Sequence, residues 1–217
     1  WLQLLCLSLV VMRCQPLRRA LWRNMDIELY KGWLKELMGI LDGAAFPKGN
    51  RAKVSFSLLH LSIEHHQSMI LLSEFGKYGS ALALLRPQRD TCLRGMWYLR
   101  NANEEQLEKF LSDKNPPGIK DLLKGIEQTE PFTQGHISSL MDKVGNLLHD
   151  FTHGGLYQAA IRHKGSHISS SIDPSQLNAF LCVSQALALA ASHDVILATG
   201  DKEREKALIS AHTKYFP

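Results

Sequence analysis

Apolar residues recur at helical spacing along most of the chain. Between Met25 and Asp42 they fall three or four residues apart, as they would on one face of an α-helix. A longer stretch with this spacing begins at about Arg51 and continues to Tyr78, and Gly79 is expected to end it. The pattern therefore predicts two amphipathic helices, the second longer than the first.

Further helical stretches follow. The next one runs to about Asn101, with Ser80 in a position to cap it and Pro87 inside it. Because proline removes a backbone donor and crowds the preceding turn, we expect a kink or a restart at Pro87. The remaining stretches with helical spacing cover about residues 103–113, 119–128, 133–151, 156–162, 175–199 and 201–212. Residues 164–173 are expected to form a polar loop, and no segment has a convincing strand pattern.

This succession of elements predicts an all-α protein. Helices of more than about 20 residues joined by short turns favour an antiparallel helical bundle. The length of 217 residues and the hydrophobic fraction of 45% are ordinary for a globular protein with one core. We expect residues 25–217 to form a single helical-bundle domain.

The first residues differ from the rest. Residues 1–12 read WLQLLCLSLVVM, an apolar run that is shorter than the ~20 residues needed to cross a bilayer. No basic residue precedes this run, as one would in a secretory signal. Residues 1–24 are expected to be an extension outside the fold, with Met25 as the natural start. A membrane anchor or a truncated signal is the alternative, and no membrane span is expected.

The basic surplus lies in the same segment. The chain has 25 basic and 21 acidic residues, and four arginines with no acid fall within residues 1–24. Without those four, the basic and acidic residues are equal in number, so a broad basic face for nucleic acid is not indicated. Any site for an anion must therefore be local.

The cysteines indicate neither a metal nor a redox motif. Cys92 and Cys182 lie in apolar helical stretches, and no two cysteines form a CxxC pair. They are expected to be buried thiols, which fits a reducing cytoplasm.

Polar residues interrupt one apolar helix in a regular way. Arg86, Asp90 and Arg94 are four residues apart, so they share a helical face, and Trp97 continues it. Two arginines on either side of one aspartate would leave spare guanidinium donors that suit a phosphate or carboxylate. The alternative is an internal ion-pair clamp that holds helices in register.

A second group of polar residues is denser. It consists of His149, Asp150, Thr152, His153, Gly154, Gly155 and Arg162. Histidine beside a carboxylate is the usual acid–base pair near neutral pH, and two glycines allow the backbone to approach a ligand closely. The alternative is that His153 bonds to a neighbouring helix and the glycines serve close packing.

The run Glu64-His65-His66 lies in the middle of the long second helix. One of these histidines is expected to face inward and the other to face solvent. Metal binding by His65 with His153 and an acid is conceivable, but no ligand spacing supports it, so no metal is expected. No phosphate-binding loop, dinucleotide fingerprint, HExxH or GxSxG motif occurs in the sequence, and no cofactor is expected.

Two runs of sequence resemble a known family. They are SALALLRPQRDTCLRGMWYL at Ser80–Leu99 and LLHDFTHGGLYQAAIRH at Leu147–His163. They resemble an uncharacterised bacterial family of helical proteins with the pattern S-A-x-x-L-x-R-P, R-G-x-W and, later, T-H-G-G followed by an arginine. This chain carries Asp90 where that family usually has glutamate. The resemblance covers about Met25 to the end.

That family is loosely similar to the HEPN superfamily of helical bundles, many of which are ribonucleases. Their R-x4-6-H signature acts on RNA at a dimer interface, so the resemblance implies RNA as a partner and a homodimer. The literal match in this chain is Arg162 to His167, and His167 falls outside the resembling runs. Arg94 and His153 could supply the same chemistry from separate helices, which is an analogy and not a motif.

Two functions remain open. In the first, the protein is a HEPN-like, metal-independent ribonuclease. Arg86, Arg94 and Arg162 would bind phosphate, and His153 would act as general base with Arg94 and Asp90 in the catalytic group. In the second, the protein is a non-enzymatic helical module, and the same residues form a structural polar core or bind a small anion or protein partner. A cavity that holds Arg86, Arg94 and His153 would favour the first function, and full burial with every donor paired would favour the second.

Overall fold

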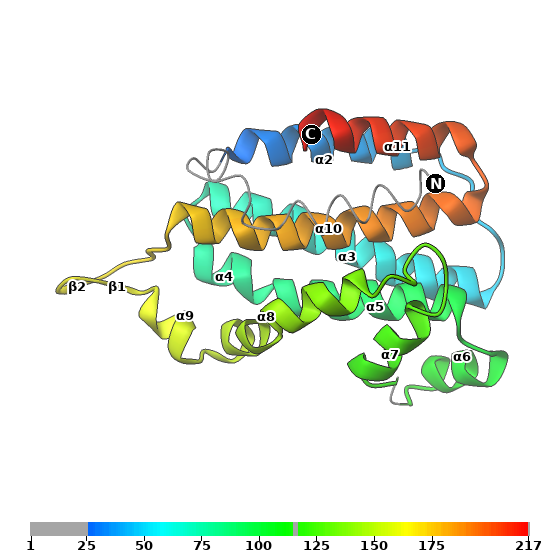
Figure 1. The fold of residues 1–217 in the computed structure, drawn as a ribbon, viewed down its shortest axis with the longest axis horizontal. Coiled ribbons are helices and arrows are strands. Elements are labelled where there is room, and N and C mark those ends of the chain that lie inside the picture. The colour runs from blue at the N-terminus through cyan, green and yellow to red at the C-terminus, as the bar shows by residue number, and fades with distance from the viewer. Residues whose placement is uncertain (1–25, 115–116, 217) are drawn as a thin grey trace.

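The computed structural model describes residues 26–114 and 117–216, which form ten helices and one short hairpin (Figure 1). The helices are α2 (Ile27–Leu41), α3 (Asn50–Glu74), α4 (Tyr78–Ala83), α5 (Leu85–Arg100), α6 (Glu104–Leu111), α7 (Ile119–Ile126), α8 (His136–His153), α9 (Leu156–Ala160), α10 (Pro174–Thr199) and α11 (Lys202–Tyr215). The prediction of an all-α bundle is confirmed. Residues 1–24, expected to be an extension, lie outside the described residues.

Three long helices, α3, α5 and α10, pack against one another at the centre. Helices α2 and α11 lie side by side on one side of α10, and α4, α5 and α8 lie on the other (Figure 1). Successive long helices run in opposite directions, as expected for chain segments joined by short turns.

Helix α10 has no single apolar face, because most of its residues between Leu177 and Ile196 are buried within the bundle. It is long and apolar enough to cross a membrane by length and composition, yet 89% of its most apolar window is buried within the bundle. That burial is typical of a core helix.

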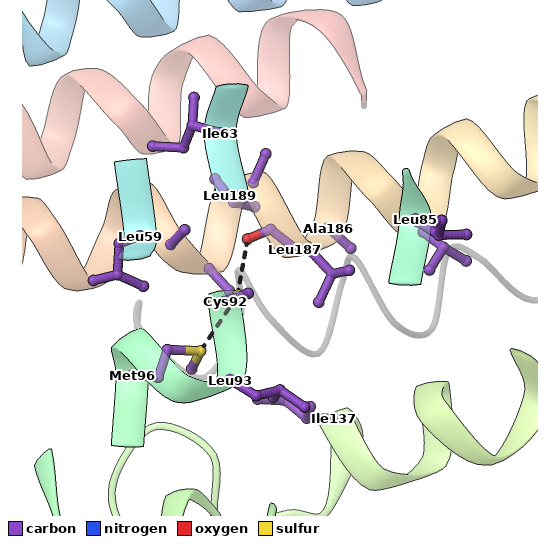
Figure 2. Close-up of a cluster of buried hydrophobic side chains, with 14 of the residues drawn as sticks. Leu59, Ile63, Leu85, Cys92, Leu93, Met96, Ile137, Ala186, Leu187 and Leu189 are labelled. Carbon is purple, nitrogen blue, oxygen red and sulfur yellow. Dashed lines mark hydrogen bonds between the residues drawn. The ribbon is translucent and has the colours of Figure 1, made fainter. Parts of the chain in front are cut away.

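Side chains of α5 and α10 line a small apolar space in the core. Leu93 and Met96 of α5 lie on one side of it, with Ala186 and Leu187 of α10 and Ile137 of α8 around it (Figure 2). The thiol of Cys92 donates to the carbonyl of Leu187 at 3.4 Å. Burial, helped by the negative charge of Asp194, raises the pKa of Cys92 to about 12. As expected from the sequence, Cys92 is a buried thiol.

One predicted boundary changes in the structure and one predicted restart is present. The second helix ends at Glu74, because the left-handed turn is made by Gly76, at a φ of 66°; Gly79 instead lies inside α4. Helix α5 begins anew at Leu85, which places Pro87 in its first turn, where the missing N–H needs no partner. This is the restart expected there.

Part of the predicted polar loop at residues 164–173 belongs to a hairpin. Strand β1 (His163–Lys164) pairs antiparallel with β2 (His167–Ile168), so the expectation that the chain has no strand was wrong. These strands have two residues each, too few for an alternating pattern to emerge from the sequence.

Candidate functional site

Arg86 lies between two histidines of another helix. Its Nη1 donates to Nδ1 of His149 at 3.2 Å and to Nε2 of His153 at 2.5 Å. The two imidazole rings are 4.5 Å apart, and both histidines are exposed. We call these three residues the Arg86 site. A guanidinium group has only donors, so both imidazoles accept from Arg86.

Two helix ends create the Arg86 site. Arg86 is in the first turn of α5, and His149 and His153 are one turn apart at the end of α8. The unpaired carbonyl groups at a helix C-terminus carry partial negative charge, which favours a cation beside the last turn of α8. The ribonuclease hypothesis placed Arg86 near His153, and these two side chains are in contact.

Asp150, the acid next to these histidines, has a structural role. A carboxylate oxygen of Asp150 accepts the backbone N–H of Gln158 at 2.9 Å, and so caps the start of α9. Gly155 lies directly beneath this carboxylate, where any side chain would overlap it. Gly154 ends α8 with a φ of 68°. The two glycines therefore allow close packing within the chain, as in the alternative interpretation of this segment.

Asp90 does not link Arg86 to Arg94, which corrects the predicted charge strip. Its carboxylate accepts from Nε and Nη2 of the adjacent Arg89, at 2.8 and 2.6 Å. These two side chains retain 12% and 21% exposure, so the acid is largely neutralised by its neighbour. Arg89 could not be predicted as the partner of Asp90, because adjacent residues do not usually face each other on a helix.

Arg94 is separate from the Arg86 site. It is half-buried, and its Nε is buried without a hydrogen-bond partner among the described residues. The nearby Tyr98 has a raised pKa, chiefly because it is buried, and the positive charge of Arg94 opposes that shift. No contact joins Arg94 to His153 in the part of the chain that the structure describes, so the expected convergence of Arg94 with His153 is not observed.

Trp97 belongs to the core. It is 7% exposed and packs against Gly125 of α7, where a Cβ atom would lie 2.7 Å from the indole Nε1. Thr152 donates to the carbonyl of Leu148 at 2.8 Å, a bond within its own helix. Of these two residues predicted to support the site, Trp97 is a core residue and the Thr152 hydroxyl is bonded within α8.

Arg162 packs across Gly79 of α4, so closely that a side chain there would overlap the guanidinium group. Gln158 lies beside it and donates from Nε2 to the Gly79 carbonyl at 2.9 Å. Arg162 therefore packs the segment after α9 against α4. His167, the other half of the R-x4-H match, is exposed in the hairpin.

One histidine of the pair on α3 faces inward, as expected, but the other does not fully face solvent. His66 is completely buried, and His65 is half-buried. Burial lowers the pKa of His65, although neighbouring Glu64 opposes the shift, and lowers the pKa of His66 to about 3. No group of three or more His, Cys, Asp or Glu side chains that could hold a metal occurs among the described residues, so no donor set joins His65 to His153.

His66 takes part in a buried polar network that was not predicted from the sequence. Its Nδ1 contacts Oγ of Ser184 at 2.7 Å, and that hydroxyl donates to Oε1 of Gln88 at 2.6 Å. Nε2 of the same glutamine donates to the Ser184 carbonyl at 2.7 Å. Because the Ser184 proton is directed to Gln88, His66 donates from Nδ1, and the network joins α3, α5 and α10.

A buried ion pair between Arg100 and Asp194 was also not predicted from the sequence. Asp194 of α10 is fully buried and accepts from Nε of Arg100 at 2.7 Å and from its Nη2. Nη1 of the arginine donates to the carbonyl of Glu130 at 2.7 Å, and the guanidinium lies over the ring of Phe132, at 4.8 Å from its centre. The sequence signal was an aspartate within an otherwise apolar helix.

The sequence profile of a family of unknown function, DUF6988, matches residues 59–217. The chain belongs to this family. The match includes α5, α8 and the whole Arg86 site. Searches of curated proteins and of solved structures give no match.

Proposed function

We propose that this member of DUF6988 binds a phosphate group of RNA at the Arg86 site. The observation that supports the proposal is the meeting of one arginine with two exposed histidines from another helix. Guanidinium and imidazolium groups are the usual partners of phosphate, and all three are donors when the histidines are protonated.

The surrounding charges favour an anion. The two nearest acids in sequence, Asp90 and Asp150, are bonded to Arg89 and to the backbone of Gln158. Neither acid therefore neutralises Arg86. A guanidinium beside both imidazole acceptors also repels divalent cations, which would need the same nitrogen lone pairs.

The more specific proposal is that the protein cleaves the RNA that it binds. His153 would take the proton from a ribose 2′-hydroxyl while the 2′ oxygen forms a bond to phosphorus. The bond from phosphorus to the 5′ oxygen would break, and the leaving oxygen would take a proton from solvent. Arg86 would stabilise the charge on the phosphate oxygens. Because Arg94 and Asp90 lie apart from His153, the proposed catalytic group contains Arg86 and His153.

Anion binding without catalysis is the second candidate. It is favoured by the engagement of both imidazole lone pairs with Arg86, so that neither histidine presents a free base at rest. A phosphate would then compete for the guanidinium, and the protein would act as a binding module.

One pair of assays separates these functions. Purified protein is incubated with single-stranded RNA in the presence of a chelator, and RNA binding is measured in parallel by fluorescence anisotropy. His153→Ala should abolish cleavage, whereas His60→Ala, which removes an exposed histidine of α3, should not. Binding that depends on Arg86 without any cleavage would support the binding module. Equal RNA binding by the wild type and Arg86→Gln would refute both functions.

A further inference from the structure

A cavity opens beside the C-terminal end of α2. Its volume is about 610 Å³, within the range of roughly 300–1,000 Å³ that is usual for small-molecule sites. The described residues that line it come from α2, the loop after α2, α3 and α10, so the cavity is separate from the Arg86 site on α5 and α8. Most of the lining is apolar, and the larger of these side chains are Met38, Leu41, Phe46, Phe56, Ile63 and Val195.

The cavity connects the core with the surface. Ile63 and Val195 are 3% and 5% exposed, whereas Met38 and Phe46 are 38% and 52% exposed. The rings of Phe46 and Phe56 lie next to each other, with their centres 5.0 Å apart. A ligand that enters would therefore meet a buried apolar floor and an aromatic wall, which is the usual composition of a small-molecule site.

Gly39 leaves part of this space open. It is a helical residue of α2 in the cavity lining, and a Cβ atom added there would meet no atom within 4 Å. Glycine weakens a helix relative to residues with side chains, and the packing around α2 does not require it here. A larger side chain at this position would occupy the cavity without displacing a neighbour.

The polar groups of the cavity favour a cation over an anion. Asp42 lines it, and its carboxylate has no hydrogen-bond partner among the described residues. The nearby Arg204 does not offset this charge, because it is bonded to Asp201 and to backbone carbonyl groups at the end of α2. The other titratable side chain of the described lining is His60, whose neutral imidazole can accept a hydrogen bond.

We propose that this cavity binds a small apolar molecule that carries one ammonium group. The apolar part lies against Phe56 and Ile63, and the ammonium group pairs with the carboxylate of Asp42. The ring faces of Phe46 and Phe56 also attract cations. A fatty acid or another apolar anion would bring its carboxylate close to that of Asp42, where the two charges repel. The inference is independent of the function proposed for the Arg86 site.

Three ligands with the same apolar part test the charge preference. They are 4-phenylbutylamine, 4-phenylbutanol and 4-phenylbutyrate, which end in an ammonium, a hydroxyl and a carboxylate group. In titration calorimetry with the full chain, the amine should bind most tightly and the carboxylate least tightly. Asp42→Asn should weaken binding of the amine about tenfold and change binding of the alcohol less than about twofold, because only the amine pairs with a carboxylate. The control Asp142→Asn removes an exposed acid of α8 and should change neither.

Gly39→Leu tests the cavity itself. The leucine side chain fills the open space, so binding of all three ligands should be lost. Gly145→Leu, at a helical position of α8 that is also surrounded by open space, should leave binding unchanged. Both substitutions replace glycine with a better helix former, so the melting temperature of each variant should not fall, and a loss of binding then reports on the cavity.

Four results would overturn the proposal. Binding of the carboxylate as tight as that of the amine would refute the preference for a cation. Equal binding of the amine by the wild type and Gly39→Leu would refute the cavity as its site. If none of the three ligands binds at millimolar concentration, the cavity does not accept small apolar molecules. A dimer in sedimentation experiments that Gly39→Leu dissociates would show that a second copy of the chain covers the cavity instead.

Discussion

The carboxylate of Asp150 lies directly over the backbone of Gly155, and no side chain fits between them. The same carboxylate caps α9 through the N–H of Gln158. This relationship fixes the angle at which the chain leaves α8, and with it the position of the last turn that carries His149 and His153. The glycine and the acid are thus structural supports of the Arg86 site.

Gly155→Ala should destabilise the protein because the new methyl group displaces the Asp150 carboxylate from the end of α9. Loss of the cap alone costs about 1 kcal/mol, and the overlap adds to it, so we expect a loss of roughly 1–3 kcal/mol in urea unfolding. Gly145→Ala is the matched control: it is a helical position of α8 with open space around it, and alanine there should be neutral or stabilising by up to about 1 kcal/mol. Equal effects of the two substitutions would contradict the role given to Gly155.

Removing one partner of the ion pair between Arg100 and Asp194 should be far more damaging. Arg100→Met leaves a fully buried carboxylate without its charge partner, a change that typically costs about 3–5 kcal/mol. The surface pair of Lys109 and Glu105 offers a comparison, because Lys109→Met should cost less than about 1 kcal/mol. Thermal unfolding of both variants measures the difference, and a small loss in Arg100→Met would show that Asp194 is neutralised in another way.

Arg86→Ala should turn the Arg86 site into a weak cation site. His149 and His153 are one helical turn apart, and their ring nitrogens that face Arg86 would be free to bind a divalent ion such as Ni2+ or Zn2+. Titration calorimetry should detect Ni2+ binding to this variant and weaker or no binding to the wild type. In the double variant Arg86→Ala/His149→Ala the gain should disappear; if it persists, the ion binds elsewhere.

The sequence predicted the helices more accurately than the contacts between them. Helical spacing identified α2 and α10 almost to the residue, since it depends only on which positions face the core. The break after α3 was misplaced because Gly76 and Gly79 are equally plausible as terminators by sequence, and only packing decides that Gly79 accommodates Arg162.

The candidate site was predicted in part for a similar reason. Polar residues in apolar helices indicated which segments would meet, and Arg86 does meet His153. The hydrogen-bond partner of each side chain, however, depends on the direction in which it points. The Asp90 carboxylate bonds to Arg89, and the Asp150 carboxylate bonds to the backbone of α9. The contacts of His66 with Ser184 and Gln88 were missed because a buried polar network joins positions far apart in the sequence.

His66 should make the stability of the fold sensitive to acid. Burial lowers the pKa of His66 to about 3 in the folded protein, whereas an unfolded histidine titrates near 6.5. Between these values the unfolded state binds more protons, so the free energy of unfolding falls as the pH falls from about 6.5 toward 3 and is unaffected by this group above that range. At pH 5 the His66 contribution amounts to a loss of about 2 kcal/mol relative to pH 7.

The contribution of His66 is isolated by comparing variants at the two pH values. His66→Gln removes the titrating group, so its unfolding free energy should fall less between pH 7 and pH 5 than that of the wild type, by about 2 kcal/mol. The exposed carboxylates whose pKa is lowered, such as Asp173 and Asp201, contribute equally to both proteins and cancel. The control His60→Gln, at an exposed position of the same helix, should follow the wild-type curve. If the wild type and His66→Gln lost the same stability between pH 7 and pH 5, His66 would have to be accessible to protons in the folded bundle, and the network through Ser184 would not be closed.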